Sequence, residues 1–211
     1  MAEPGPIAGR TPLTVERAQV PRSFYEREPA TVAVDLLGKL LVHGERVGRI
    51  VEVEAYRGLS DPASHSFRGP TRRNATMFGP AGHLYVYRSY GIHWCANASC
   101  GDGNAVLVRA LEPVDGIEAM RASRGDPRRD RDLCSGPGKL CQALGIHGEL
   151  DGADLVTGEQ GVAIVSDGTP PPPDPVRTPR IGISVAVDEL LRFHVPGDPN
   201  VSRPVGSRVR A

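Results

Sequence analysis

Two carboxylates and one aromatic side chain alternate along residues 46–56, which read RVGRIVEVEAY. The pattern predicts a β-strand, whose successive side chains point to opposite faces. Val51, Val53 and Ala55 then face a core, while Ile50, Glu52, Glu54 and Tyr56 share the other face. This acidic and aromatic face meets a Gly-rich loop, where active sites are common, and an ionised carboxylate there can orient water. The alternative is a solvated sheet face on which the glutamates pair with arginines.

A second candidate segment is residues 83–99, HLYVYRSYGIHWCANAS, which indicates two strands joined at Ser89-Tyr90-Gly91. Tyr90 then stands at the tip of a hairpin, where an aromatic ring has few neighbours to pack against. One interpretation is a wedge inserted between base steps of a nucleic acid. The other is a ring that lies back on its own hairpin.

The register of this hairpin has two solutions. A three-residue loop, with Gly91 at positive φ, puts Tyr85 and Tyr87 on the same side as His93, Cys95 and Asn97. A two-residue loop puts Tyr87 and Asn97 on opposite sides. The sequence leaves both open.

The other motifs give weaker evidence of a catalytic or binding site. His65, in DPASHS, has no second ligand at metal spacing, and the cysteines at 95, 100, 134 and 141 match no zinc pattern. Residues 135–139, SGPGK, lack P-loop spacing, and no G-x-S-x-G motif occurs. Lys139 is a candidate Schiff-base nucleophile, although a lysine after Pro-Gly more often begins a helix or contacts phosphate. We therefore expect no metal and no cofactor.

Charge argues against a polybasic nucleic-acid binder, because 25 Lys and Arg balance 25 Asp and Glu. The balance is local, however: residues 49–109 hold seven Arg against four acids, a net charge of +3. Only Lys39 and Lys139 are lysines, and Arg favours bidentate contacts with phosphate or carboxylate. Codon bias in a GC-rich genome explains the excess of Arg equally well.

The sequence also bears on the cellular compartment. No apolar run approaches the roughly 18 residues that cross a bilayer, and the first residues, MAEPGPIAGRTP, lack the apolar region of a secretory signal. We therefore expect a cytoplasmic protein that does not enter the membrane. In that reducing compartment the four cysteines are expected to be thiols.

The remaining pattern predicts one domain over residues 14–211, after a Pro- and Gly-rich segment, 1–13, that we expect to be disordered. Helices are predicted from about Ala30 to residue 41, with positions 32, 36, 37 and 40 on one face, and over 114–124 and 137–145, the last capped by Gly145. Further strands are predicted at 105–111 and near 161–165, 180–185 and 192–195. Residues 57–82, 101–104 and 168–175 are predicted to be loops or turns.

Long segments of the chain together resemble the alkyladenine (3-methyladenine) DNA glycosylase family, over about residues 20–205. The segments are LLGKLLV at 36–42, GRIVEVEAY at 48–56, DPASHS at 61–66, TRRNATMFGPAGHLYVYRSYGIHWCAN at 71–97, GDGNAVLVRALEP at 101–113, LCSGPGKLCQALGI at 133–146, RIGIS at 180–184 and LRFHVPGDPNVS at 191–202. Such motifs in this order are highly specific. The resemblance implies an α/β (α+β) fold: one domain with a curved antiparallel sheet, flanking helices and a protruding β-hairpin.

The resemblance also implies roles for individual residues. Glu54 fills the position of the family's general base, and Arg109 a position beside the attacking water. Tyr90 fills that of the side chain that enters the duplex. The positions that line the base pocket are filled by Tyr56, His65, Tyr87 and Asn97, of which Asn97 disfavours the exocyclic amine of guanine. Contacts with DNA or within loops are expected of Arg73, Asn74 and Lys139.

The activity implied is that of a monofunctional DNA glycosylase, which flips alkylated or deaminated purines out of duplex DNA and hydrolyses the N-glycosidic bond, the first step of base excision repair. Flipping costs a few kcal/mol, and stacking on aromatic rings returns roughly 1–3 kcal/mol per base. The expected partner is double-stranded DNA with a damaged purine, bound by a monomer. The alternatives are a catalytically silent binder of damaged DNA and an RNA- or nucleotide-directed hydrolase on the same scaffold.

Overall fold

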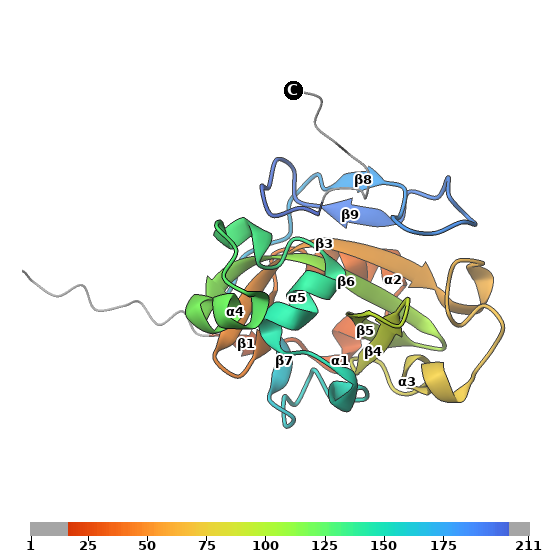
Figure 1. Cartoon of the computed structure of the whole chain (residues 1–211). Helices are drawn as coiled ribbons and strands as arrows, with labels where there is room; N and C mark the ends of the chain where they lie inside the picture. The colour runs from red at the N-terminus through yellow and green to blue at the C-terminus, as the bar shows by residue number, and fades with distance from the viewer. Residues whose placement is uncertain (1–16, 203–211) are drawn as a thin grey trace, which may run out of the picture.

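The structure, a computed structural model, describes residues 17–202, whose arrangement is shown in Figure 1. Its strands are β1 (Ala18–Gln19), β2 (Leu40–His43), β3 (Arg46–Arg57), β4 (Leu84–Ser89), β5 (His93–Gly101), β6 (Asn104–Asp115), β7 (Val162–Ser166), β8 (Val176–Thr178) and β9 (Arg192–His194). Its α-helices are α1 (Arg22–Tyr25), α2 (Pro29–Leu36), α3 (Ala75–Phe78), α4 (Ile117–Arg124) and α5 (Pro137–Leu144). Short 3-10 helices occur at η1 (Gly58–Ser60), η2 (Arg72–Asn74), η3 (Asp130–Asp132) and η4 (Gly148–Leu150).

The strand β3 organises the sheet. The strand order is β1-β7-β2-β3-β6-β5-β4, and each of these pairs is antiparallel. One edge of β3 pairs first with β2, over residues 46–49, and then with β9, over residues 52–54. The pair β8–β9 therefore lies beside β3, at the top of Figure 1. The predicted α+β fold, with a curved antiparallel sheet, flanking helices and a hairpin, is confirmed.

Irregular pairing between β3 and β6 changes which side chains reach the core. Ile50 pairs with Leu111 and Val53 pairs with Val108, but the register shifts twice between these two pairs. Each strand therefore has one residue there without a partner on the other strand. Such a bulge interrupts the two-residue alternation of side chains. The prediction that Ile50 shares a face with the glutamates is therefore wrong: Ile50 packs in the main core with Val53 and Ala55.

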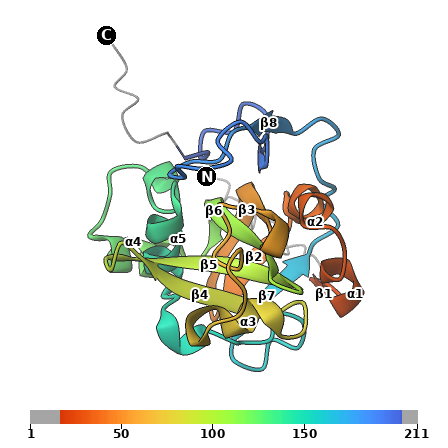
Figure 2. The same cartoon turned by 90° about the vertical axis from the view of Figure 1, so that its right-hand side faces the viewer.

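The two faces of strands β4 to β6 serve different purposes. One face packs into the main core, together with apolar residues of α2, α4 and α5, through Leu84, Val86, Ala96, Ala98, Val106 and Val108. The alternate residues point the other way, because side chains of a strand change face at each step. Figure 2 shows α1 and α2 towards one end of these strands and α4 and α5 towards the other. The face of β4 to β6 that points away from the core is therefore free to carry a functional site.

The hairpin β4–β5 adopts the register in which Tyr85 and Tyr87 share a face with Cys95 and Asn97. Tyr87 pairs with Cys95, and Tyr85 with Asn97. The connection consists of Tyr90, Gly91 and Ile92, one residue later than predicted, with φ angles of 51° at Tyr90 and 68° at Gly91. Two consecutive positive φ angles match the right-handed twist of the strands that they join.

Several predicted elements differ from those observed. The first long helix ends at Leu36, because Gly38 has a φ of +87° and Leu40 begins β2 in a small separate apolar cluster. The strand expected at 180–185 is wrong; the strand after the polyproline loop is β8, and Arg180 and Ile181 instead contact β3 and its following loop. The loop 57–82 contains η1, η2 and α3.

Other expectations agree with the structure. α5 ends at Gly145, whose φ is +71°, as predicted. All four cysteines are buried free thiols, as expected. Within residues 17–202, none of the helices combines the length and the apolar character needed to cross a membrane. The expected disorder of residues 1–13 lies outside the described residues.

Two glycines with positive φ provide a test of the fold. An Ala at Gly116 (φ +69°) would put its Cβ 2.7 Å from the carbonyl oxygen of Glu45, whereas Gly44 (φ +57°) has open space around it. Gly116→Ala should lower the free energy of unfolding by about 3 kcal/mol, and Gly44→Ala by about 1 kcal/mol. Urea unfolding measures both values, and equal losses would mean that β2–β3 and α4 do not approach as described.

Candidate active site

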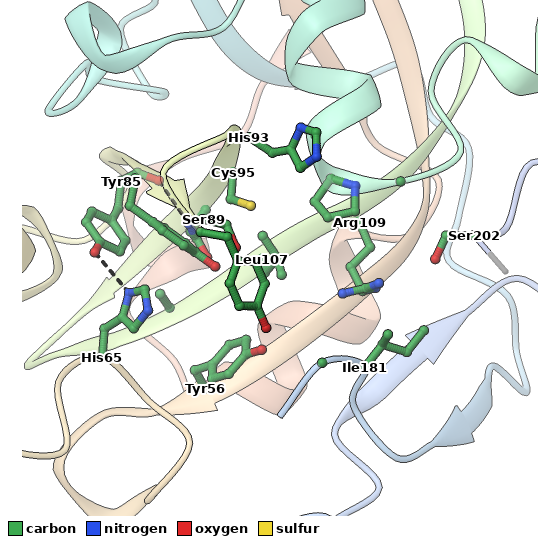
Figure 3. Close-up of a pocket in the computed structure, with 18 of the residues that line it drawn as sticks. Tyr56, His65, Tyr85, Ser89, His93, Cys95, Leu107, Arg109, Ile181 and Ser202 are labelled. Atoms are coloured by element: carbon green, nitrogen blue, oxygen red, sulfur yellow. Dashed lines mark hydrogen bonds between the residues drawn. The ribbon is translucent and has the colours of Figure 1, made fainter. Parts of the chain in front are cut away.

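A cavity of about 740 Å³ lies on the face of the sheet opposite the main core (Figure 3). Its floor is formed by the alternate residues of β4, β5 and β6. Loop residues 63–65 form one wall, and residues 181–183 and the start of α5 form others. Ligand sites commonly have volumes of roughly 300–1,000 Å³. The cavity therefore has room for one flat heterocyclic group.

Aromatic rings surround the first part of the cavity. The ring of His65 meets that of Tyr87 edge-on, with centroids 4.4 Å apart, and its Nδ1 lies 3.1 Å from the hydroxyl of Tyr85. Tyr85 and Tyr87 stack at 5.5 Å. Burial, and secondarily Arg73, lowers the pKa of His65, so that this imidazole is neutral at neutral pH. Burial raises the pKa of Tyr85 to about 12.

Glu54 lies behind the cavity wall and has no exposed surface. Its Oε2 accepts a hydrogen bond from the Tyr56 hydroxyl at 2.8 Å, and its Oε1 accepts one from the Ile181 N–H at 2.8 Å. A guanidinium nitrogen of Arg109 lies 3.2 Å from the same Oε1. Tyr56, Arg109 and Ile181 all line the cavity, as Figure 3 shows, so each of them links the carboxylate to it.

A second carboxylate, Glu52, is also fully buried on this face. It accepts hydrogen bonds from Arg109 Nε at 3.1 Å and from Arg192 Nε at 2.6 Å. Although burial opposes the charged form, Glu54 and Glu52 together raise the pKa of Arg109. Two fully buried carboxylates and two largely buried guanidinium groups therefore balance one another's charge beside the cavity.

Tyr56 is held on its other side by a buried ion pair. The guanidinium of Arg180 lies 4.6 Å from the centre of the Tyr56 ring. Its Nη2 donates to Asp61 Oδ1 at 2.9 Å, and its Nη1 also contacts this carboxylate. Burial first, and then the Glu54 carboxylate, raises the pKa of the Tyr56 hydroxyl. Tyr56 thus stays a protonated donor to Glu54.

The exposed residues predicted for DNA contact lie around the rim. Tyr90, at the hairpin tip, is 85% exposed. Arg73 lies with its guanidinium 5.8 Å from the centre of the Tyr87 ring and donates to the Arg88 carbonyl oxygen. Lys139 Nζ donates to Ser135 Oγ at 3.2 Å. All three belong to the cavity lining.

Asn74 lies outside the cavity and holds the loop that forms its wall. Its side chain is buried, and its Nδ2 donates to the carbonyl oxygens of His65 and Gly69, at 2.9 and 3.2 Å. Asn74 and Thr71 also cap η2 reciprocally. Asn74 therefore makes hydrogen bonds within the loop, and one of them holds the backbone of His65.

Asn97 lies on the cavity floor, where its Nδ2 donates to the Tyr85 carbonyl oxygen at 3.0 Å. Within the described part of the chain, no cluster of three or more His, Cys, Asp or Glu side chains is arranged to hold a metal ion. The site thus consists of aromatic rings, an amide, buried carboxylates and guanidinium groups.

Several residues of the site were not predicted. Tyr85 and Cys95 line the cavity, and the odd-numbered alternation of the hairpin could have identified both. Ile181, Arg192 and Ser202 contact the buried carboxylates from more than 120 positions along the chain. Because no local pattern connects these positions with β3, only the folded chain reveals them.

One family model and three relatives that match this chain are all named as one class, the DNA glycosylases. Residues 23–199 match the model of the family described as methylpurine-DNA glycosylase. A protein of Burkholderia lata named "Putative 3-methyladenine DNA glycosylase" is 55% identical over 195 residues, covering 90% of this chain and 94% of the relative. Proteins with the same name from Methanoculleus marisnigri and Agrobacterium fabrum are 55% and 50% identical, covering 87% and 88% of this chain and 98% and 93% of the relatives.

The buried pair between Asp61 and Arg180 leads to a stability prediction. Asp61→Asn removes the counter-ion of a guanidinium that has no exposed surface, so the free energy of unfolding should fall by about 3 kcal/mol. The control is Asp115→Asn, because the pair between Asp115 and Arg17 is exposed and should contribute less than about 1 kcal/mol. Urea unfolding of both variants is the measurement; similar losses would show that the Asp61 pair is not buried.

Proposed function

The chain belongs to the methylpurine-DNA glycosylase family and is a DNA glycosylase, a hydrolase of N-glycosyl bonds, and from this premise we propose that it flips alkylated or deaminated purines out of duplex DNA and releases them with water. One observation carries the proposal: a cavity with room for one purine is lined by aromatic rings, and a fully buried carboxylate lies behind its wall. The base would enter the cavity, and the carboxylate would activate the water that attacks the sugar.

The aromatic part of the cavity suits a flipped purine. Stacking on a ring is worth roughly 1–3 kcal/mol per base, comparable to the few kcal/mol that flipping costs. Purines alkylated at N3 or N7 carry a positive charge, which the electron-rich rings of Tyr56 and Tyr87 attract. A neutral His65 does not repel such a base. Asn97, on the floor, would disfavour the exocyclic amine of guanine.

Glu54 is the proposed general base. Its contact with Arg109, 3.2 Å long, is the longest of its three polar contacts and lies at the cavity. We expect water to enter beside Arg109 when DNA binds, since catalytic contacts often tighten only in the complex. The water oxygen then attacks C1′, Glu54 takes its proton, and the purine leaves with the electron pair of the N-glycosidic bond. The carboxylate also stabilises the positive charge that develops on the sugar.

Tyr90 is the proposed wedge. It extends from a tight turn with positive φ, and 85% of its surface is exposed although it is aromatic. Inserted side chains of this kind separate base steps and bend the duplex. Tyr90 would fill the gap that the flipped purine leaves in the helix.

The product would be an abasic site with both strands intact. Lys139 lies at the α5 side of the cavity, hydrogen-bonded to Ser135, and we assign it to a phosphate contact rather than to a Schiff base. The enzyme would act as a monomer on damaged double-stranded DNA.

Glu54→Gln tests the proposed function directly. Base release from a duplex with one labelled hypoxanthine or 3-methyladenine should fall about a thousandfold, because the amide cannot take the proton of water. Binding of the same duplex should stay near the wild-type value. Alkali-dependent cleavage measures release, and gel-shift titration measures binding. Lesion binding without release by the wild type would instead support a silent binder, and near-normal turnover of the variant would exclude Glu54 as the base.

Tyr90→Ala tests the wedge. Loss of the ring should weaken binding of a lesion duplex about tenfold, corresponding to one lost stacking contact, and should slow release to a similar extent. Tyr90→Phe, which keeps the ring, is the matched control and should behave like the wild type. Thermal unfolding should be unchanged in both variants, because the side chain is exposed. An unaltered lesion affinity in Tyr90→Ala would show that the ring does not enter the duplex.

A further inference from the structure

Glu52 is fully buried and has more polar contacts than Glu54, although the proposed reaction gives it no step. Its Oε1 accepts hydrogen bonds from Arg109 Nε at 3.1 Å, from Arg192 Nε at 2.6 Å and from Ser202 Oγ at 2.8 Å. Its Oε2 accepts one from the Ser202 N–H at 2.6 Å. One carboxylate therefore connects β3, β6, β9 and the end of the described chain.

The contacts of Arg109 differ on its two sides. Its Nε donates a hydrogen bond to Glu52, while one of its terminal nitrogens lies 3.2 Å from Glu54 as an ion pair. A guanidinium is planar and rigid, so a hydrogen bond at Nε fixes the direction in which the terminal nitrogens point. Figure 3 shows Arg109 extending from β6 towards Ile181, whose N–H also binds Glu54.

We propose that Glu52 is a positioning residue for base release: it orients Arg109 towards Glu54 and, together with Arg192, sets the charge around Glu54. This inference rests on the proposed function, in which Glu54 is the base. A purely structural need at a buried site is often met as well by apolar side chains. The paired charges are therefore best explained by what they do to the neighbouring carboxylate.

Charged and titratable groups approach Glu54 from each element packed against it. They are Glu52 and Tyr56 on β3, Tyr87 on β4, Cys95 on β5, Arg109 on β6, Arg192 on β9, and Arg180 with its partner Asp61. The burial of Tyr56, Tyr87 and Cys95 raises their pKa values, so these three stay neutral at neutral pH. The charges of Glu52, Arg109 and Arg192 and of the Arg180–Asp61 pair remain to act on Glu54 together.

Two substitutions change this charge in opposite directions. Glu52→Gln removes a negative charge and leaves Arg109 to Glu54 alone, which favours the charged form of Glu54. Arg192→Gln removes a positive charge and leaves Glu52 to hold Arg109 more strongly, which disfavours the charged form of Glu54. A charge that lies near a carboxylate moves its protonation equilibrium by on the order of one pH unit.

The experiment uses the full chain and single-turnover release from a duplex with one labelled hypoxanthine, measured across the pH range in which each protein stays folded. The acid limb of the profile should move about one pH unit down in Glu52→Gln and about one unit up in Arg192→Gln. The plateau rate of Glu52→Gln should fall about tenfold, with lesion binding unchanged. Asp167→Asn is the control, because Asp167 lies outside the cavity and pairs with Arg49, which is on β3 like Glu52. The acid limb of this variant should match that of the wild type.

A role of Glu52 that is only structural would lower the thermal stability without moving the two acid limbs apart, and that result would overturn the inference. Should Glu52→Gln fail to fold, Arg192→Gln carries the test, and an unshifted limb in this variant overturns the inference equally. Wild-type protein that releases no base from any lesion would overturn the proposed function, and the inference with it. Release by the wild type with unshifted variants would overturn the inference alone.

Discussion

The structure depends on the burial of two glutamates on one face of one strand. A buried carboxylate costs several kcal/mol unless it is paired and hydrogen-bonded, and Glu52 and Glu54 are both without exposed surface. Arg109 and Arg192 supply the opposite charges, and the backbone N–H groups of residues 181 and 202 supply further hydrogen-bond donors. Segment 181–202 must therefore fold back onto β3 before both carboxylates have all their partners.

This requirement explains the local irregularities of the sheet. The broken register between β3 and β6 keeps Ile50 in the core while Glu52 and Glu54 stay on the other face. Arg109 lies within the same irregularity and reaches both glutamates. The pairing of β9 with residues 52–54 brings Arg192 alongside. The sheet thus separates its apolar core on one face from a charged and aromatic site on the other.

Local sequence patterns predicted those parts of the fold and site that depend on near neighbours. The alternation along 46–56 placed Glu54 and Tyr56 on a common face, and Gly145 marked the end of α5. The bulge that turns Ile50 inwards has no sequence signature of its own, because it follows from the pairing of two distant strands. The hydrogen bond from Ile181 to Glu54 joins residues 127 positions apart, so only tertiary structure could reveal it.

An experimental structure of the protein bound to a duplex with a non-hydrolysable damaged nucleotide would show whether Glu54 directs water to the sugar of a flipped purine. We expect the base among Tyr56, His65 and Tyr87, with an ordered water within hydrogen-bonding distance of both Glu54 and Arg109 and facing C1′. A base bound elsewhere, or a Glu54 that remains closed off from the sugar with no water between them, would contradict it.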